Sequence, residues 1–374
     1  MRKYHIMFSP GPSETNPRAL KEMISPADDI WDEEFLSIYN EARDLLKEIF
    51  GVKRGEVVIM PNPSFGSMEA SVLNFLYGKK VLTAVNGFFG AQFRDIVSIY
   101  SREWKEIRKE RVPINLEEVD YGDFEYITVV HSETSAGIRN PVEEIPEEVF
   151  SVVDCVSSLG GMKFEMERWG IDVAFAGMQK AISGPPGISA IALSEEAVDE
   201  LMDKKEVRSW YFDLRKWLDR ETPYPATVPT QAIRGLRKAL IEVVKEGESR
   251  IKRHERLAMA FRKAIIGMGL EMYPKCEECP GCSSKRRFCS DTITVFRSPF
   301  NSFKLIKEVM KFGILIKPGI GKMKQELIRI GHMGMTSNEA LISNLLIALE
   351  RGLKDLGFKI EESGLEIFRE ELKR

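Results

Sequence analysis

Two charged side chains lie at the ends of apolar runs, where an active site is readily built. Lys180 follows the run DVAFAG (172–177) and precedes a rigid Pro-Pro-Gly turn, and Asp154 lies within the run SVVDCV (151–156). A partly desolvated lysine near other cations has the lowered pKa that imine formation requires. A buried carboxylate is costly without a cationic or hydrogen-donating partner. The two residues are therefore candidates for covalent catalysis through a lysine imine.

Three further strand ends carry suitable groups. The run at 57–60 is followed by PNPSFGSMEA, whose turn opens a helix at Ser67 and whose free N–H groups can cradle a phosphate. NGFFG follows 81–85 and HSETSAG follows 126–130. Taken singly, each candidate also has a structural explanation: Lys180 as a solvated loop lysine, Asp154 as a cap, Phe89 as core. Their shared position at one sheet edge favours a ligand site.

These residues must be positioned by a mostly parallel sheet covered by helices on both faces, because short continuous apolar runs alternate with amphipathic stretches. The strand candidates are 57–60, 81–85, 126–130, 151–156, 172–177 and 188–193, and the helical candidates are 67–77, 90–101 and 142–150. In such α/β folds, ligands bind at the carboxyl ends of the strands.

The pattern changes after about residue 230, where one long helical segment (230–268) precedes weaker strands and further helices. This change predicts a smaller C-terminal α+β domain. We expect an N-terminal segment near the active site (1–15), a large cofactor-binding domain (16–245) and a small domain (246–374). The expected strands of the small domain are 292–296, 313–317 and 326–330, and its expected helices are 302–311, 337–356 and 362–373.

Composition narrows the function classes. The net charge of −3 over 374 residues provides no broad basic field for nucleic acid or anionic lipid. Mixed-sign patches such as 102–111 indicate solvated helix faces. No segment reaches the roughly 18 apolar residues of a membrane span, and the N-terminus lacks an apolar signal core, so we expect a cytoplasmic protein. Heavy use of Lys, Arg and Glu fits a thermophile.

Several long motifs resemble the class V, fold-type I pyridoxal-phosphate-dependent aminotransferases, closest to the alanine–glyoxylate and serine–pyruvate branch. The resemblance runs from SPGPSETNPRAL to IRIGHMG. Its sharpest stretches are HSETSAGIRNPVEEI, VVDCVSSLGGMKFEMERWGIDVAFAGMQKAISGPPG, and YPATVPTQAIRGLRKAL with the later KRH (252–254). The resemblance implies transfer of an amino group, by a ping-pong mechanism, from alanine or serine to glyoxylate or pyruvate.

The resemblance also implies residue roles around pyridoxal 5'-phosphate. Lys180 is the Schiff-base lysine and proton shuttle, and Asp154 is the partner of the pyridine nitrogen, which it keeps protonated as an electron sink. Phe89 stacks on the cofactor ring, Thr134 lies near the phenolic oxygen, and Gln179 is a phosphate-side ligand.

Further implied roles concern the substrate and a second subunit. Arg329 in IRIGHMG holds the substrate α-carboxylate, which a guanidinium grips bidentately, and Gly11 lies in the segment that approaches the substrate. Tyr224 and Thr227 in YPAT reach the phosphate of the neighbouring subunit, which implies a homodimer with shared active sites.

One loop departs from the family pattern. Where the family has Gly-Ser-Gly-Thr before Met-Glu-Ala, this chain has Asn62-Pro63-Ser64-Phe65. Backbone donors of Phe65 and Gly66, with the Ser64 hydroxyl, remain able to cradle a phosphate. Phe65 replaces the usual threonine and narrows the pocket, so the departure bears on substrate choice more than on cofactor binding.

Cys276, Cys279, Cys282 and Cys289 form a Cys-rich insertion (276–289) outside the family pattern. Four cysteines this close can bind a structural zinc ion or form disulfides, with an iron–sulfur cluster less favoured. They also suggest a cysteine desulfurase, but Phe89 stands where desulfurases stack a histidine, and His131 lies at a different strand end. Transamination of phosphoserine, aspartate or a phosphonate, and a non-catalytic scaffold, also remain open.

Overall fold

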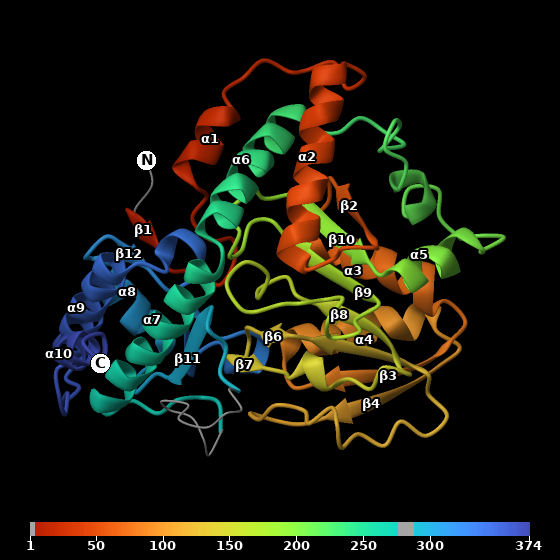
Figure 1. Cartoon of the computed structure of the whole chain (residues 1–374). Helices are drawn as coiled ribbons and strands as arrows, with labels where there is room; N and C mark the ends of the chain where they lie inside the picture. Colours follow the sequence, from red (N-terminus) through yellow and green to blue (C-terminus); the bar gives the residue numbers. More distant parts are fainter. Residues whose placement is uncertain (1–3, 276–287) are drawn as a thin grey trace.

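The structure, a computed structural model, describes residues 4–275 and 288–374, and Figure 1 shows how its elements are arranged. Within those two ranges, no helix has the length and apolar character needed to cross a bilayer. Two large hydrophobic cores organise the chain. One surrounds a seven-stranded sheet, and the other joins the N-terminal segment to the C-terminal third of the chain.

The seven-stranded sheet has the order β2-β10-β9-β8-β5-β3-β4, and its neighbours are parallel except where β10 runs antiparallel to β2 and β9. The carboxyl ends of six strands and the start of β10 therefore share one edge. The predicted mostly parallel sheet is confirmed. Its strands are β2 (Glu56–Met60), β3 (Lys80–Val85), β4 (Glu103–Arg108), β5 (Tyr126–Val130), β8 (Phe150–Asp154), β9 (Val173–Gly177) and β10 (Ser189–Leu193).

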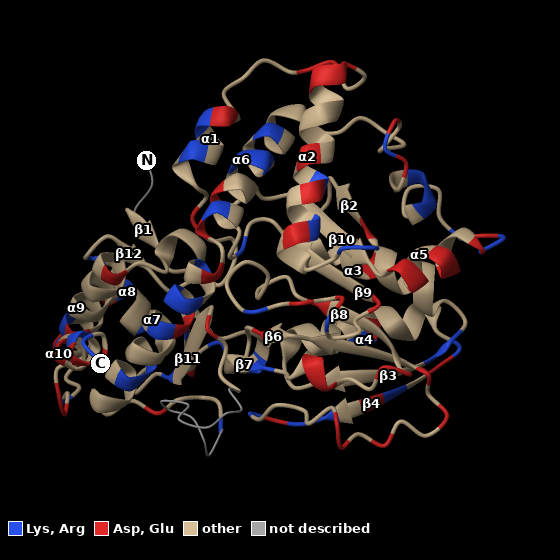
Figure 2. Cartoon of the chain, viewed as in Figure 1, with Lys and Arg blue, Asp and Glu red and all other residues tan. Residues whose placement is uncertain are grey.

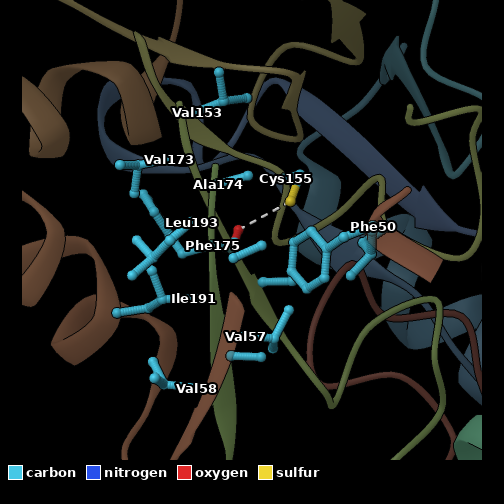
Figure 3. Close-up of a cluster of buried hydrophobic side chains, with 14 of the residues drawn as sticks. Phe50, Val57, Val58, Val153, Cys155, Val173, Ala174, Phe175, Ile191 and Leu193 are labelled. Atoms are coloured by element: carbon cyan, nitrogen blue, oxygen red, sulfur yellow. Dashed lines mark hydrogen bonds between the residues drawn. The ribbon is translucent and has the colours of Figure 1, made fainter. Parts of the chain in front are cut away.

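Each of the six apolar runs expected to be a strand belongs to this sheet. They contain apolar residues at consecutive positions because both faces of a central parallel strand are covered. Figure 3 shows part of the core, where Phe50 lies on the same side as Val57 and Cys155. The Cys155 thiol donates to the carbonyl of Phe175 at 3.1 Å, so this buried sulfur has a polar partner within the sheet.

Helices cover the sheet because each buries an apolar face. α2 buries Phe35, Ile38 and Tyr39 at helical spacing, and the Tyr39 hydroxyl donates to the carbonyl of Ile59 in β2 at 2.8 Å. α2 packs along α6, α3 packs on β9 and β10, and α4 packs on β3 and its neighbours β5 and β4. The helices of this part are α1 (Pro17–Glu22), α2 (Glu33–Phe50), α3 (Ser64–Ser71, continued by a π-helix at Val72–Leu76), α4 (Phe88–Tyr100), α5 (Glu195–Met202) and α6 (Thr230–Glu246).

The second core holds a three-stranded antiparallel sheet of order β11-β14-β13 and four helices. A parallel two-stranded pair joins β1 near the N-terminus to β12, with Ile6 opposite Ile314. The N-terminal segment therefore packs with the C-terminal part, beside the large sheet (Figure 1). The elements are β1 (Ile6–Met7), α7 (Glu248–Gly267), β11 (Ile293–Arg297), α8 (Ser302–Met310), β12 (Ile314–Leu315), β13 (Lys317–Pro318), β14 (Leu327–Gly331), α9 (Glu339–Asp355) and α10 (Gly364–Glu371).

The long helical segment expected at 230–268 is two helices. α6 ends at Glu246 and α7 begins at Glu248, and Gly247 between them has φ +54°. Residues with a side chain rarely adopt this backbone conformation, so glycine permits the break. The expected domain boundary at 245/246 lies at this break.

Other sequence expectations were wrong as well. The helix expected to open at Ser67 begins at Ser64. The charged stretch 102–111, expected to form helix faces, contains the edge strand β4, which pairs only with β3 among the described strands. Charged side chains suit an exposed edge strand, and Figure 2 shows charges of both signs along it. The stretch 142–150, expected to be helical, forms one 3₁₀ turn at Val142–Glu144 and then leads into β8. Pro141 and Pro146 interrupt a regular helix there.

We predict that Phe175→Ala lowers the free energy of unfolding by about 3–5 kcal/mol. Phe175 is fully buried and packs edge-to-face on Phe93 with ring centroids 5.5 Å apart, so truncation leaves a cavity. The matched control is Phe312→Ala, because this phenylalanine is 46% exposed. Urea denaturation with an unchanged slope measures both variants, and equal losses would show that the sheet core is not the main source of stability.

Candidate active site

Residues from several strand ends line one cavity of about 330 Å³ at the common edge of the sheet. Asp154 ends β8, and Lys180 follows the neighbouring strand β9. Seven of the predicted site residues line this cavity together: Gly11, Ser64, Phe65, Phe89, Asp154, Gln179 and Lys180. The remaining lining residues are Pro12, Pro63, Met68, Val156, Pro186 and Gly187.

The Lys180 amine lies in a desolvated position. Burial lowers the pKa of Lys180 to about 8, the negative charge of Asp154 opposes this shift, and the positive charge of Arg329 adds to it. The amine donates to the carbonyl of Pro10 at 2.5 Å. A substantial fraction of the amine is therefore uncharged near neutral pH, which is the nucleophilic form.

The N-terminal segment holds the backbone around Lys180. Ser13 donates from its N–H to the carbonyl of Gln179 at 2.8 Å and from its hydroxyl to the carbonyl of Lys180 at 2.6 Å. A Cβ on Gly11 would lie 2.0 Å from the Lys180 Nζ, so only glycine allows this close approach. Sequence reasoning placed Gly11 near the substrate but missed Ser13 and the Pro10 carbonyl.

Asp154 is only 5% exposed and accepts a hydrogen bond from the N–H of Val156 at 2.8 Å. Burial raises the pKa of Asp154 to about 7; the Val156 N–H opposes the shift, the negative charge of Glu133 adds to it, and Lys180 opposes it more weakly. The carboxyl group is thus held near its point of ionisation and faces a cavity that also contains an amine.

The start of α3 provides polar groups at another wall of the cavity. Ser64, Phe65 and Gly66 form the first turn of this helix, which has no side-chain cap, and the N–H of Gly66 donates to the carbonyl of Pro63 at 2.7 Å. The Gln179 amide nitrogen donates to the Ser64 hydroxyl at 3.3 Å, and the Gln179 Oε1 is buried without a hydrogen-bond partner among the described residues. The Ser64 hydroxyl, the Gln179 amide nitrogen and the helix N-terminus are donors that can receive an anion.

Phe89 in the first turn of α4 provides an aromatic wall. Its ring lies 6.5 Å from that of Phe65 and 5.4 Å from that of Phe88, centroid to centroid. Phe65 is 42% exposed and stands at the mouth of the cavity. The two rings therefore give a partly apolar wall to the cavity that Asp154 and Lys180 also line.

Glu133 is a functional candidate that sequence reasoning missed. This fully buried carboxylate accepts from the N–H of Gly90 at 2.9 Å and from the Ser135 hydroxyl at 2.6 Å. Burial raises the pKa of Glu133, and the carboxylate acts electrostatically on both Asp154 and Arg329. It also stabilises the α4 N-terminus that carries Phe89. The acidic residue inside HSETSAG, among small polar neighbours, was the available signal.

Arg329 lies on β14 of the second core, close enough to influence Lys180 electrostatically. Its Nε donates to the carbonyl of Pro318 at 2.8 Å, and burial lowers the pKa of Arg329 to about 10. It does not line the cavity itself. Thr134 is buried directly after Glu133, at the turn between β6 (Ser132–Glu133) and β7 (Ile138–Arg139).

Besides Arg329, four predicted residues do not line the cavity: Gly66, Thr134, Tyr224 and Thr227. Tyr224 is buried in the large core, where its hydroxyl donates to the carbonyl of Ile30 and its ring packs edge-on to Tyr39. Thr227, three residues later, is exposed. Neither lines the cavity described above.

The cysteine cluster falls mostly outside the described residues, which exclude Cys276, Cys279 and Cys282. Cys289 is buried and forms a β-bridge with Ile138. In the described part of the chain, no group of three or more His, Cys, Asp or Glu residues is arranged to hold a metal ion. The zinc hypothesis therefore has no support from the structure.

Comparison with known proteins places this geometry in a family. A model of the aminotransferase class-V family matches residues 97–289. An uncharacterised aminotransferase of Methanocaldococcus jannaschii is 31% identical, over 98% of this chain and 97% of the relative. An L-aspartate–glyoxylate aminotransferase of Paracoccus denitrificans is 26% identical (96% and 94% covered), and a serine–glyoxylate aminotransferase of Hyphomicrobium methylovorum is 28% identical (95% and 91%).

The fold is similar to that of a solved pyridoxamine–pyruvate aminotransferase from Mesorhizobium loti. The TM-score is 0.91 at 24% identity, with 99% of this chain and 97% of that chain covered. The large sheet and the smaller C-terminal part thus agree with the fold of that structure. The chain belongs to the class-V aminotransferases, which have the type I fold of pyridoxal-phosphate enzymes.

Proposed function

We propose that this aminotransferase moves an amino group from a small neutral amino acid, alanine or serine, to glyoxylate or pyruvate. The observation that carries the proposal is the placement of the Lys180 amine and the Asp154 carboxyl group at one apolar-walled cavity. Glyoxylate is named in the enzymes of both Paracoccus and Hyphomicrobium, whereas their donors are aspartate and serine. The choice of amino donor therefore depends on the apolar surface and the charges of the cavity walls.

The family implies pyridoxal phosphate, and the residues present fit it. The donors at the start of α3 suit the phosphate end, with the Ser64 hydroxyl, the Gln179 amide nitrogen and the N–H group of Phe65 as ligands; the N–H of Gly66 would have to exchange its bond to the Pro63 carbonyl for one to the phosphate. When bound, the cofactor supplies an electron sink for the bonds at the substrate Cα. Asp154 would hold the ring nitrogen, Phe89 the ring face and Thr134 the phenolic side.

Lys180 would attach the cofactor and then carry the proton that leaves the substrate Cα. Its pKa of about 8 leaves the amine able both to accept and to release a proton near neutral pH. Because Asp154 is buried, water would screen its charge little, and the carboxyl group would interact strongly with the ring nitrogen of the cofactor. Arg329 would orient the substrate by its α-carboxylate.

The cavity walls favour small neutral donors over acidic ones. Phe65, Met68, Phe89 and Val156 supply apolar surface, and among the described residues lining the cavity Lys180 carries the only positive charge. A donor with a second carboxylate or a phosphate would bury that charge without a further cationic partner among the described residues that line the cavity. Alanine and serine carry no such group.

A homodimer is part of the proposal. Thr227 is exposed and would reach the phosphate cradle of a partner subunit. The buried ring of Tyr224 would hold the loop that carries Thr227 in place. Large exposed apolar side chains near this region and the cavity mouth support a covering partner: Ile24, Trp31, Phe65 and Phe88 are 85%, 55%, 42% and 38% exposed.

The test of the proposed function is a panel of single amino donors against glyoxylate and pyruvate. Lys180→Ala should lower turnover by about 10³-fold or more. Borohydride should then no longer fix the cofactor to the chain, as read by intact mass. The control is Lys163→Ala, because the Lys163 side chain is 61% exposed and pairs with Glu165. Turnover of Lys180→Ala within tenfold of the parent would refute the proposal.

Asp154→Asn should have opposite effects on stability and on cofactor binding. The folded pKa of about 7 lies above the ordinary value of 3.8, so ionising the buried carboxyl costs stability as pH rises through this interval. In the cofactor-free protein, the variant should therefore gain stability relative to the parent from pH 5 to pH 8, by up to about 3 kcal/mol. Cofactor affinity should fall at pH 8.

Denaturant titrations at pH 5 and pH 8, and cofactor titration at pH 8, measure these effects. A stability difference that is the same at both pH values would mean that Asp154 is not the buried ionising group.

Arg329→Lys should raise the KM for the amino donor about tenfold or more while changing kcat less, because a point charge replaces a two-pronged grip. Arg297→Lys on the neighbouring strand β11 is the control, since its side chain is 33% exposed and pairs with Glu271 and Glu326. Steady-state kinetics with alanine and serine distinguish the two. An unchanged KM in the Arg329 variant would place the carboxylate site elsewhere.

A further inference from the structure

Arg250 of α7 has no role in the proposed chemistry, yet it is only 6% exposed and makes three strong contacts. Its Nε donates to the carbonyl of Gly160 at 2.7 Å and one terminal nitrogen donates to the carbonyl of Ala181 at 2.5 Å. The other terminal nitrogen pairs with Glu246, one turn earlier along the chain, at 2.7 Å. One guanidinium thus joins two loops of the large domain to the first helix beyond the Gly247 break.

Both loops lead directly from the candidate catalytic residues. Ala181 is the neighbour of Lys180. Gly160 lies in the compact turn after Asp154, where the N–H groups of Leu159 and Gly161 donate to the carbonyls of Cys155 and Ser158 at 3.0 and 2.9 Å. A shift of the Ala181 carbonyl would therefore move the backbone that carries Lys180, and a shift of the Gly160 carbonyl would move the turn that follows Asp154.

The two loops also touch each other where Arg250 joins them. A Cβ added to Gly161 would lie 2.8 Å from the Ala181 Cβ. The guanidinium is planar and presents its N–H donors in a fixed fork, so the two carbonyl oxygens are held at a set separation. Lysine, with one flexible ammonium group, cannot reproduce this geometry.

We propose that Arg250 is a positioning residue that fixes the distance between Lys180 and Asp154 by bridging the Ala181 and Gly160 carbonyls. It acts through the backbone and touches neither the cavity nor the substrate site. The inference rests on the proposed role of Lys180. Arg250 ties the site to α7, so the spacing of the catalytic pair depends on a residue beyond the large domain.

The test measures the Lys180 amine itself, in the folded protein without cofactor. Reductive methylation across pH 6–11, with quantification of the Lys180 peptide by mass spectrometry, gives the midpoint pH of its reactivity. In the parent we expect a midpoint near 8, as burial dictates. In Arg250→Lys and Arg250→Met, the loosened loop admits water, and the midpoint should rise by about one unit. At pH 8 the uncharged fraction then falls from about half to about a tenth.

Arg253→Met is the matched control. Arg253 lies on the same helix and pairs with the same Glu246, but donates to the carbonyl of Ser337 rather than to either catalytic loop. Its midpoint should equal that of the parent. Melting temperatures of all variants confirm that each is folded at the labelling temperature.

The two Arg250 variants separate geometry from charge. Arg250→Lys keeps the positive charge and loses the fork, so an unshifted midpoint in this variant overturns the proposal, whether or not Arg250→Met shifts. With a transaminase assay, kcat of Arg250→Lys should also fall about 10- to 100-fold with little change in the KM for the amino donor. Labelling needs no turnover, so an inactive parent enzyme would refute the proposed function without affecting this test.

Discussion

The structure depends on two opposite charges withdrawn from water in one cavity. Burial moves the pKa of Lys180 down to about 8 and that of Asp154 up to about 7, and each charge partly offsets the shift of the other. Burial disfavours the charged form of each group, so each group needs a hydrogen-bond partner in the protein. The neighbouring strands β8 and β9 place them side by side, and the Pro10 carbonyl and the Val156 N–H provide their direct hydrogen bonds. The remainder of the site is arranged around this pair.

The two hydrophobic cores carry different residues of the candidate site. The large core positions the groups that would hold a cofactor, whereas Arg329 is carried by the second core. Contacts between the cores therefore set how Arg329 lies relative to Lys180. The N-terminal segment and Arg250 provide two of these contacts, and both end on the backbone around Lys180.

The sequence predicted the strands well because a continuous apolar run in a covered parallel sheet has few alternatives. It failed at β4, whose charged side chains suit an edge strand and a solvated helix equally, and at 142–150, where two prolines outweigh the apolar spacing. Seven of the predicted site residues line one cavity. The sequence could predict them because the ends of the strands could be located and the motifs could be matched. Glu133, Ser13 and Arg250 were missed because their roles arise from contacts between segments distant along the chain.

The pairing of Ile6 with Ile314 joins two segments that lie more than three hundred residues apart along the chain. During synthesis at the ribosome, the N-terminal strand has no partner until more than three hundred further residues have been added. Contacts between such distant segments form late in folding. β1 gains its strand partner only when β12 is present, and the segment that carries the Pro10 carbonyl and Ser13 follows directly after β1. A chain that stops before β12 would therefore contain every strand of the large sheet, while the segment that contacts Lys180 would be anchored at one end only.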